Sequence, residues 1–176
     1  MSTTRFSKVV VFINALIPLG LLLIDVVRKN VGPNPQEFAI RTTGMLTLVF
    51  LTLTIAITPL RKTFSANSLV KLRRMVGLFA FFYGCLHLLT YIWLDRVFDL
   101  LCVGPDVARR PFILVGMTAF FLMVPLAITS TNKMVKRLGG KRWALLHKLV
   151  YLAAIGGVLH FWLLVKSDTR LPLTFG

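Results

Sequence analysis

The stretch WALLHKLVYLAAIGGVLHFWLLV at residues 143–165 decides the fold. It runs for 23 residues, and its basic side chains are His147, Lys148 and His160. A helix of about 20 apolar residues, rising ~1.5 Å per residue, crosses the ~30 Å hydrocarbon core of a bilayer. This stretch therefore predicts a membrane-spanning helix.

Four further apolar blocks of similar length lie at residues 9–27, 42–60, 75–94 and 111–130. The chain of 176 residues is 56% hydrophobic and 15% charged, whereas soluble domains carry about a quarter charged residues. The block at 9–27 contains Pro18 and Asp25 and has no small-residue cleavage site after it, so we interpret it as a retained helix and not a signal peptide. The sequence predicts an all-α, polytopic transmembrane bundle of five spans, with residues 1–176 forming a single integral membrane domain.

The net charge of +15 follows the predicted topology, and we expect a lipid bilayer and not nucleic acid as the partner. With the N-terminus inside, twelve cations and no acid fall on the inner side: Arg5, Lys8, Arg61, Lys62, Lys71, Arg73, Arg74, Lys133, Lys136, Arg137, Lys141 and Arg142. The positive-inside rule thus predicts a cytoplasmic N-terminus. The basic inner face is a topology signal, a contact for anionic lipid, or a docking site for an acidic electron donor.

The three histidines of the chain all fall inside predicted spans, where ionisable side chains are costly and usually functional. His87 lies 8 residues before Asp95, and His160 lies 6 residues before Lys166, which places them ~12 Å and ~9 Å from the outer boundary. Two helices that run in the same direction with histidine at one level can supply both axial nitrogens of a b-type haem. The alternative is that each neutral imidazole simply hydrogen-bonds a neighbouring helix.

Glycines accompany the two outer histidines. Gly84 precedes His87 by three residues, and Gly156 and Gly157 precede His160 by four and three. Residues at this spacing share a helix face, so the glycines offer a flat patch for a planar macrocycle or serve plain helix packing.

The inner side offers His147, which precedes His160 by 13 residues, or ~20 Å. Arg73 and Arg74 occupy the corresponding inner positions before His87. Either arginine could pair with a propionate, a quinone oxygen or a flavin phosphate, or both are ordinary inside-loop charges.

At these residues the chain resembles the haem-binding subunits of the ferric-reductase-like transmembrane family. The stretches that carry the resemblance are GPNPQEFAIRTTG at 32–44, TPLRK at 58–62, LRRMVGLFAFFYGCLHLLTY at 72–91 and RWALLHKLVYLAAIGGVLHFWLLVKSD at 142–168. The resemblance implies a haem-binding core at residues 42–165, with His87 and His160 on an outer haem b and His147 in a second, inner site. Family members normally continue into a sixth span, whereas this sequence ends at Gly176, so the sixth span is dispensable or the sequence is a shortened form.

The resemblance also implies a function. Such a subunit has no catalysis of its own and lies in the bacterial inner membrane. It passes electrons from the quinone pool, or from an inner-side flavin reductase, to a periplasmic molybdenum-containing methionine sulfoxide reductase. FMN has been attributed to the family, but the sequence shows no glycine-rich phosphate loop that would place it.

Two other functions remain open from the residues alone. Intramembrane histidines can relay protons in a transporter, although broken midplane helices or repeated halves are not evident in the sequence. A lipid-embedded scaffold that assembles a partner complex is the third interpretation.

Overall fold

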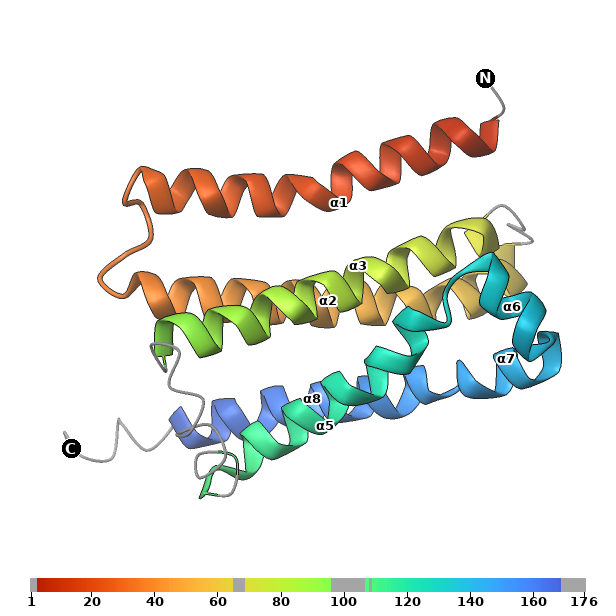
Figure 1. Cartoon of the computed structure of the whole chain (residues 1–176). Helices are drawn as coiled ribbons and strands as arrows, with labels where there is room; N and C mark the ends of the chain where they lie inside the picture. The colour runs from red at the N-terminus through yellow and green to blue at the C-terminus, as the bar shows by residue number, and fades with distance from the viewer. Residues whose placement is uncertain (1–2, 65–68, 96–106, 108, 169–176) are drawn as a thin grey trace. The chain divides into compact units, whose positions relative to one another are not determined.

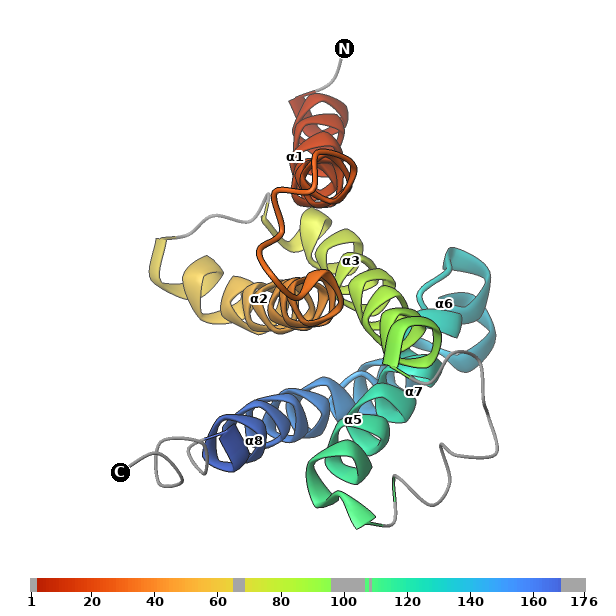
Figure 2. The same cartoon turned by 90° about the vertical axis from the view of Figure 1, so that its left-hand side faces the viewer.

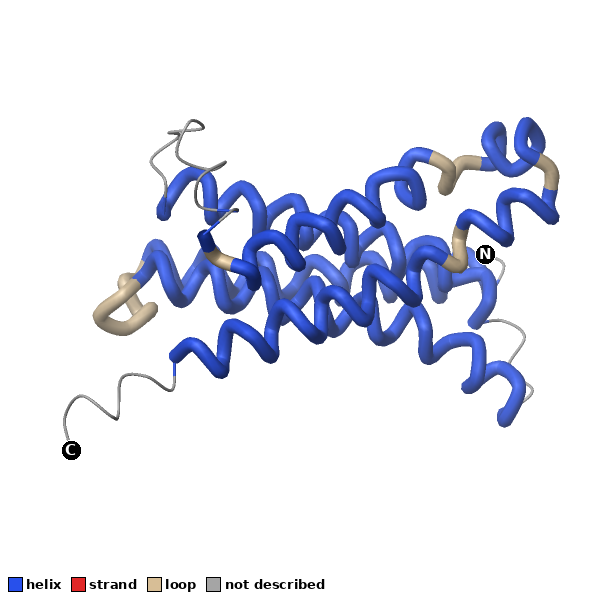
Figure 3. Tube along the Cα trace, turned by 90° about the horizontal axis from the view of Figure 1, so that it is seen from below, coloured by secondary structure: helices blue, strands red, loops and turns tan. Residues whose placement is uncertain are grey.

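The computed structural model describes residues 3–64, 69–95, 107 and 109–168. The chain forms two compact units, Met1–Val97 and Phe98–Gly176. Within the described residues all regular structure is helical, and short turns join the helices (Figure 3).

The first unit contains α1 (Thr3–Val27), α2 (Pro35–Phe64), α3 (Val70–Thr90) and a π-helical turn, η2 (Tyr91–Asp95). Gly32 has φ +72°, a left-handed conformation that glycine adopts without steric cost, and it turns the chain between α1 and α2. The side chain of Asn34 then accepts a hydrogen bond from the backbone N–H of Glu37 at 3.2 Å. Asn34 caps the helix, and Pro35 supplies a preset φ at its first position, so the two residues together start α2.

The core of the first unit is aromatic. α2 and α3 run side by side (Figures 1 and 2), and Phe50 of α2 stacks on Tyr83 of α3 with ring centroids 5.3 Å apart. Tyr83 is fully buried, and its hydroxyl donates a hydrogen bond to the Ala15 carbonyl of α1 at 2.6 Å. Ala15, Phe79 and Tyr83 form the buried centre, which joins all three helices.

The second unit contains α5 (Pro111–Ile128), α6 (Asn132–Leu138), α7 (Gly140–Leu146) and α8 (Leu149–Asp168). α5 and α8 lie side by side (Figure 1). A Cβ added at Gly156 of α8 would lie 3.0 Å from the Cβ of Ala119 on α5, so this glycine allows close helix packing. Gly139, with φ +75°, separates the two short helices α6 and α7.

The predicted bundle of five spans is confirmed for the described residues. Five helical segments are long and apolar enough to cross a membrane: Arg5–Val27, Pro35–Phe64, Lys71–Trp93, Pro111–Ile128 and Gly140–Val165. Helices of this number, length and composition are those of a multi-pass membrane protein.

The interior of two predicted spans differs from a continuous α-helix. The predicted span 143–165 is divided at His147, where the N–H groups of Lys148, Val150 and Tyr151 bond to carbonyls three residues back. This tighter pattern interrupts the regular i→i−4 ladder, so His147 does not lie on one continuous α-helix with His160. The predicted span 75–94 also departs from a continuous α-helix, because its last residues belong to the π-helical turn η2.

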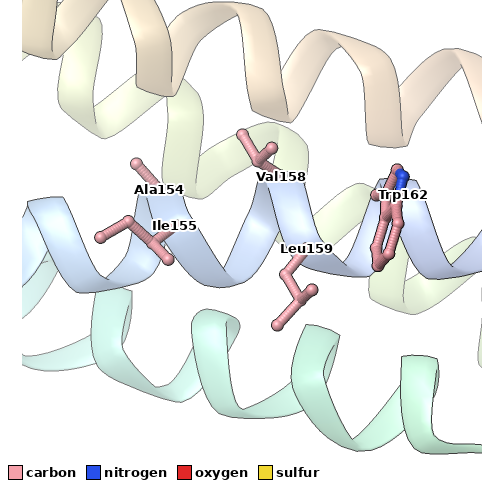
Figure 4. A pocket seen from close by; sticks show the side chains of 5 residues that line it. All are labelled: Ala154, Ile155, Val158, Leu159 and Trp162. Carbon is pink, nitrogen blue, oxygen red and sulfur yellow. The ribbon is translucent and has the colours of Figure 1, made fainter.

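Part of the surface of α8 is apolar and exposed. Ala154, Ile155, Val158, Leu159 and Trp162 line a shallow hollow on it (Figure 4). Ile155 and Trp162 are 64% and 56% exposed, as expected for a helix whose surroundings are hydrocarbon and not water.

Candidate functional site

His87 lies near the end of α3 and is half-buried against α2. Its Nδ1 is 3.0 Å from the backbone carbonyl oxygen of Ile40. A carbonyl oxygen can only accept a hydrogen bond, so we assign the ring proton to Nδ1. In the neutral imidazole the lone pair is then on Nε2, which is the nitrogen that a metal would take.

Gly44 of α2 provides the space for the His87 ring. A Cβ added at Gly44 would lie 2.9 Å from Cε1 and 3.0 Å from Nδ1 of His87, so the imidazole would have to shift. Ile40 and Gly44 are one helical turn apart, so the carbonyl and the glycine lie on the same face of α2. We call this pair, a backbone carbonyl with a glycine four residues later, a carbonyl–glycine seat.

Two hydroxyl groups lie beside the His87 seat. Thr43 is 1% exposed, and its Oγ1 lies 3.5 Å from His87 Nδ1 and 3.4 Å from the Oγ1 of Thr90. The Thr43 hydroxyl donates to the Ala39 carbonyl at 2.8 Å, which leaves its lone pairs as a weak second acceptor for the Nδ1–H of His87.

His160 of α8 has the same kind of seat on α5. Its Nδ1 is 2.6 Å from the carbonyl oxygen of Phe112. A Cβ added at Gly116 would lie 2.7 Å from Nδ1 and 2.9 Å from Cε1 of His160. Phe112 and Gly116 are again four residues apart, so the structure repeats the seat in its second unit.

Both seats lie near the start of a span. Ile40 follows the first residue of α2, Pro35, by five positions, and Phe112 follows the first residue of α5, Pro111, by one. The charge pattern predicts that α2 and α5 both start at the outer side. Each histidine is therefore held near the predicted outer end of its own helix pair.

The backbone changes its helical form directly after His87. The N–H of Tyr91 points to the carbonyls of both His87 and Leu88, and the π-helical turn η2 follows. Single π turns inside helices occur frequently at functional sites. The turn thus agrees with a functional role for His87.

His147 has a different environment. It lies between α7 and α8, its ring stacks on Trp143 with centroids 3.8 Å apart, and its Nδ1 is 3.0 Å from the Trp143 carbonyl of its own segment. Its Nε2 lies 3.4 Å from the Oγ of Ser130. Trp143 in turn donates to the Thr129 carbonyl at 2.9 Å, so this group ties α7 to the end of α5.

The two predicted inner arginines occupy the first turns of α3. Arg73 is half-buried and Arg74 is exposed. They lie 14 and 13 residues before His87 on the same helix, a separation of ~20 Å along the axis. They are therefore far from the His87 seat, at the opposite end of α3.

The donor set fits a haem better than a lone metal ion. Among the residues that the structure describes, no three His, Cys, Asp or Glu side chains form a group that could hold a metal ion. Zinc sites need three or four such ligands, whereas a haem iron takes its axial ligands from one or two side chains. A histidine that donates its second ring N–H to a backbone carbonyl has the usual arrangement of a metal-ligating imidazole.

The sequence points to the histidines but not to their seats. Gly44 and Gly116 lie on the neighbouring helices, and the glycines predicted to flank the macrocycle lie on the histidines' own helices. Of those, Gly156 packs against Ala119 of α5. Gly84 is buried and Gly157 half-buried, and their role beside a macrocycle stays a prediction.

Comparisons with known proteins identify the family. Residues 41–158 match the model of the ferric reductase like transmembrane component, a range that includes His87 and His147 and ends two residues before His160. No solved structure matches the chain.

Several curated relatives carry the name protein-methionine-sulfoxide reductase heme-binding subunit MsrQ. The protein from Herminiimonas arsenicoxydans is 54% identical over 96% of this chain and 78% of its own length. Those from Ralstonia nicotianae and Rhodospirillum rubrum are each 49% identical, over 90% and 97% of this chain and 73% and 82% of their own lengths. The chain therefore belongs to the ferric reductase-like transmembrane family and, within it, to the MsrQ family.

Proposed function

We propose that this chain is a haem-binding, membrane electron-transfer subunit of a methionine sulfoxide reductase system. In this proposal His87 and His160 supply the two axial nitrogens of one b-type haem. The observation that carries it is the shared arrangement of the two rings, each with Nδ1 against a backbone carbonyl. In this arrangement Nε2 would be the ligating nitrogen. The names of the MsrQ relatives, which are heme-binding subunits, support the binding of a haem.

A haem with two imidazole ligands would supply reversible one-electron transfer. The chain's own contribution is to hold two rings in a fixed tautomer and to surround them with apolar helices. Residues 42–165 would form this haem-binding core.

The chain would carry electrons across the membrane without catalysis of its own. We propose that they come from the quinone pool, or from an inner-side flavin reductase, and leave to a periplasmic molybdenum-containing reductase of the MsrP type. That partner would reduce methionine sulfoxide in oxidised periplasmic proteins. The excess of Lys and Arg on the predicted inner segments supports a bacterial inner-membrane location with a cytoplasmic N-terminus.

We propose that His147, Arg73 and Arg74 take part in electron entry from the predicted inner side, each within its own unit. His147 would serve a second haem there, and the arginines would pair with a propionate, a quinone oxygen or the phosphate of FMN. The double substitution Arg73→Ala with Arg74→Ala should then slow reduction by the inner donor. An unchanged reduction rate would leave the two arginines as topology signals only.

Spectroscopy of the purified full chain tests the proposal. Protein from haem-replete cells should be red, with a Soret band and a sharp α band after reduction, and pyridine haemochrome analysis gives the number of haems per chain. A colourless preparation would contradict the proposal and favour the transporter or proton-relay alternative, in which the same histidines move protons.

A further inference from the structure

The two segments that seat the histidines have different sequences. Residues 40–44 read IRTTG and residues 112–116 read FILVG, so they share only the final glycine. In both, the first residue presents its carbonyl to an Nδ1, and the fifth residue lies under the imidazole. The repeated feature is thus a backbone acceptor together with the absence of a Cβ.

We propose that Gly44 and Gly116 are positioning residues that keep each imidazole in hydrogen-bonding reach of its carbonyl. The seats thereby fix the Nδ1–H tautomer, which leaves Nε2 as the nitrogen that would bind a haem iron. This inference rests on the proposed function, because it assumes that His87 and His160 ligate a haem. Beyond that function, it assigns to Gly44 and Gly116 an influence on the basicity of each ligating imidazole.

At both glycines an added Cβ would lie very close to the atoms of the imidazole. A methyl group at Gly116 would have to share space with Nδ1, Cε1 and Cγ of His160, which would lie 2.7, 2.9 and 3.1 Å away. The imidazole is a side chain and can turn aside, so the helices need not separate. Turning aside, however, removes Nδ1 from the Phe112 carbonyl, and the histidine loses the partner that orients it.

The electronic consequence follows from this lost hydrogen bond. An imidazole that donates its Nδ1–H to an acceptor is a more basic ligand and favours the ferric state. Without the acceptor the iron is easier to reduce and the ligand binds less tightly. Gly44→Ala and Gly116→Ala should therefore raise the haem midpoint potential and accelerate haem loss, with haem affinity falling by about 10- to 100-fold.

The two glycines should differ in degree. At Gly44 the nearest His87 atoms would be 2.9 and 3.0 Å away and the third 3.6 Å, which is a milder conflict than at Gly116. The larger change in potential and in haem retention is expected for Gly116→Ala.

Glycines of the two helices that carry the histidines provide controls. A Cβ at Gly77 of α3 would meet Thr54 at 3.4 Å, an ordinary contact, so Gly77→Ala should keep the wild-type potential. A Cβ at Gly156 would press on Ala119 at 3.0 Å and not on a histidine. Gly156→Ala should thus lower thermal stability without the rise in potential, which separates strained packing from a displaced ligand.

Chemical rescue tests the carbonyl directly. In His160→Gly, added imidazole can ligate the iron and donate its other N–H to Phe112, whereas 1-methylimidazole has no N–H to donate. Restoring the low-spin spectrum should need about tenfold more 1-methylimidazole than imidazole, the equivalent of one hydrogen bond. 4-Methylimidazole is the control for size, because it carries the added methyl group of 1-methylimidazole but keeps an N–H. It should behave like imidazole.

The outcomes distinguish this inference from the proposed function. A wild-type protein without haem would overturn the proposed function. A haem-loaded wild type whose Gly44→Ala and Gly116→Ala variants keep its potential and haem retention would overturn the seats alone. Equal rescue by imidazole and 1-methylimidazole would likewise overturn them.

Discussion

The seat on α2 and the seat on α5 hold a histidine in the same way, but their surroundings differ. His87 has the buried Thr43 hydroxyl 3.5 Å from its Nδ1, and it lies one turn beyond Tyr83 of the aromatic core. His160 has the shorter carbonyl contact, 2.6 Å against 3.0 Å, next to the ring of Phe112. A backbone carbonyl thus holds each ring in place. The neighbouring side chains, Thr43 at His87 and Phe112 at His160, give the two rings different surroundings.

The largest expected effect comes from removing a ligand. His87→Ala and His160→Ala should each abolish the low-spin haem spectrum, because either leaves the iron without one axial nitrogen. If the two seats serve one haem, the two losses should be equally complete, as measured by absorption spectra of the reduced proteins. A normal low-spin spectrum in either variant would show that its seat has no ligand function.

The next effect concerns the inner histidine. His147 contacts Trp143 and Ser130 and lies ~20 Å of helix away from His160, so His147→Ala should not alter the low-spin spectrum of the outer haem. It should instead lower total haem content or slow the entry of electrons, as measured by pyridine haemochrome and by stopped-flow reduction. A change in the outer spectrum would mean that His147 acts on the same iron.

The smallest effect should come from the hydroxyl that distinguishes the two seats. Thr43→Val keeps the shape of the side chain and removes a weak acceptor near His87, so the midpoint potential should rise by about 20 mV, or ~0.5 kcal/mol for one electron. Thr47, whose hydroxyl bonds to the Thr43 carbonyl one turn further along α2, gives the control Thr47→Val with no shift. Equal potentials for the wild type and Thr43→Val would show that the difference between the seats has no electronic effect.

The sequence predicted the spans well, for a physical reason. A run of apolar residues long enough for the bilayer is a local property, and so is the distance of His87 or His160 from the end of its span. Both can be counted along the chain without knowledge of tertiary structure. Membership of the ferric-reductase-like family was predicted from motifs and is confirmed by the comparisons.

The seats could not be predicted in this way. They depend on how α2 is rotated against α3 and α5 against α8, which side-chain packing determines. A glycine at the level of a histidine on the adjacent antiparallel span is the signal that would have pointed to Gly44 and Gly116. The division at His147 was also missed, because Leu146, His147 and Lys148 include no proline or glycine and the i→i−3 bonds arise from the local fold.

The central claim is that one iron takes a nitrogen from His87 and another from His160. The haem-to-chain ratio of the low-spin species in the wild type, the two single alanine variants and the double variant tests it most directly. The account predicts that either single substitution removes as much low-spin haem as the double, because the two residues act on the same iron. Partial losses in the single variants that add up in the double variant would contradict it and assign the two histidines to separate sites.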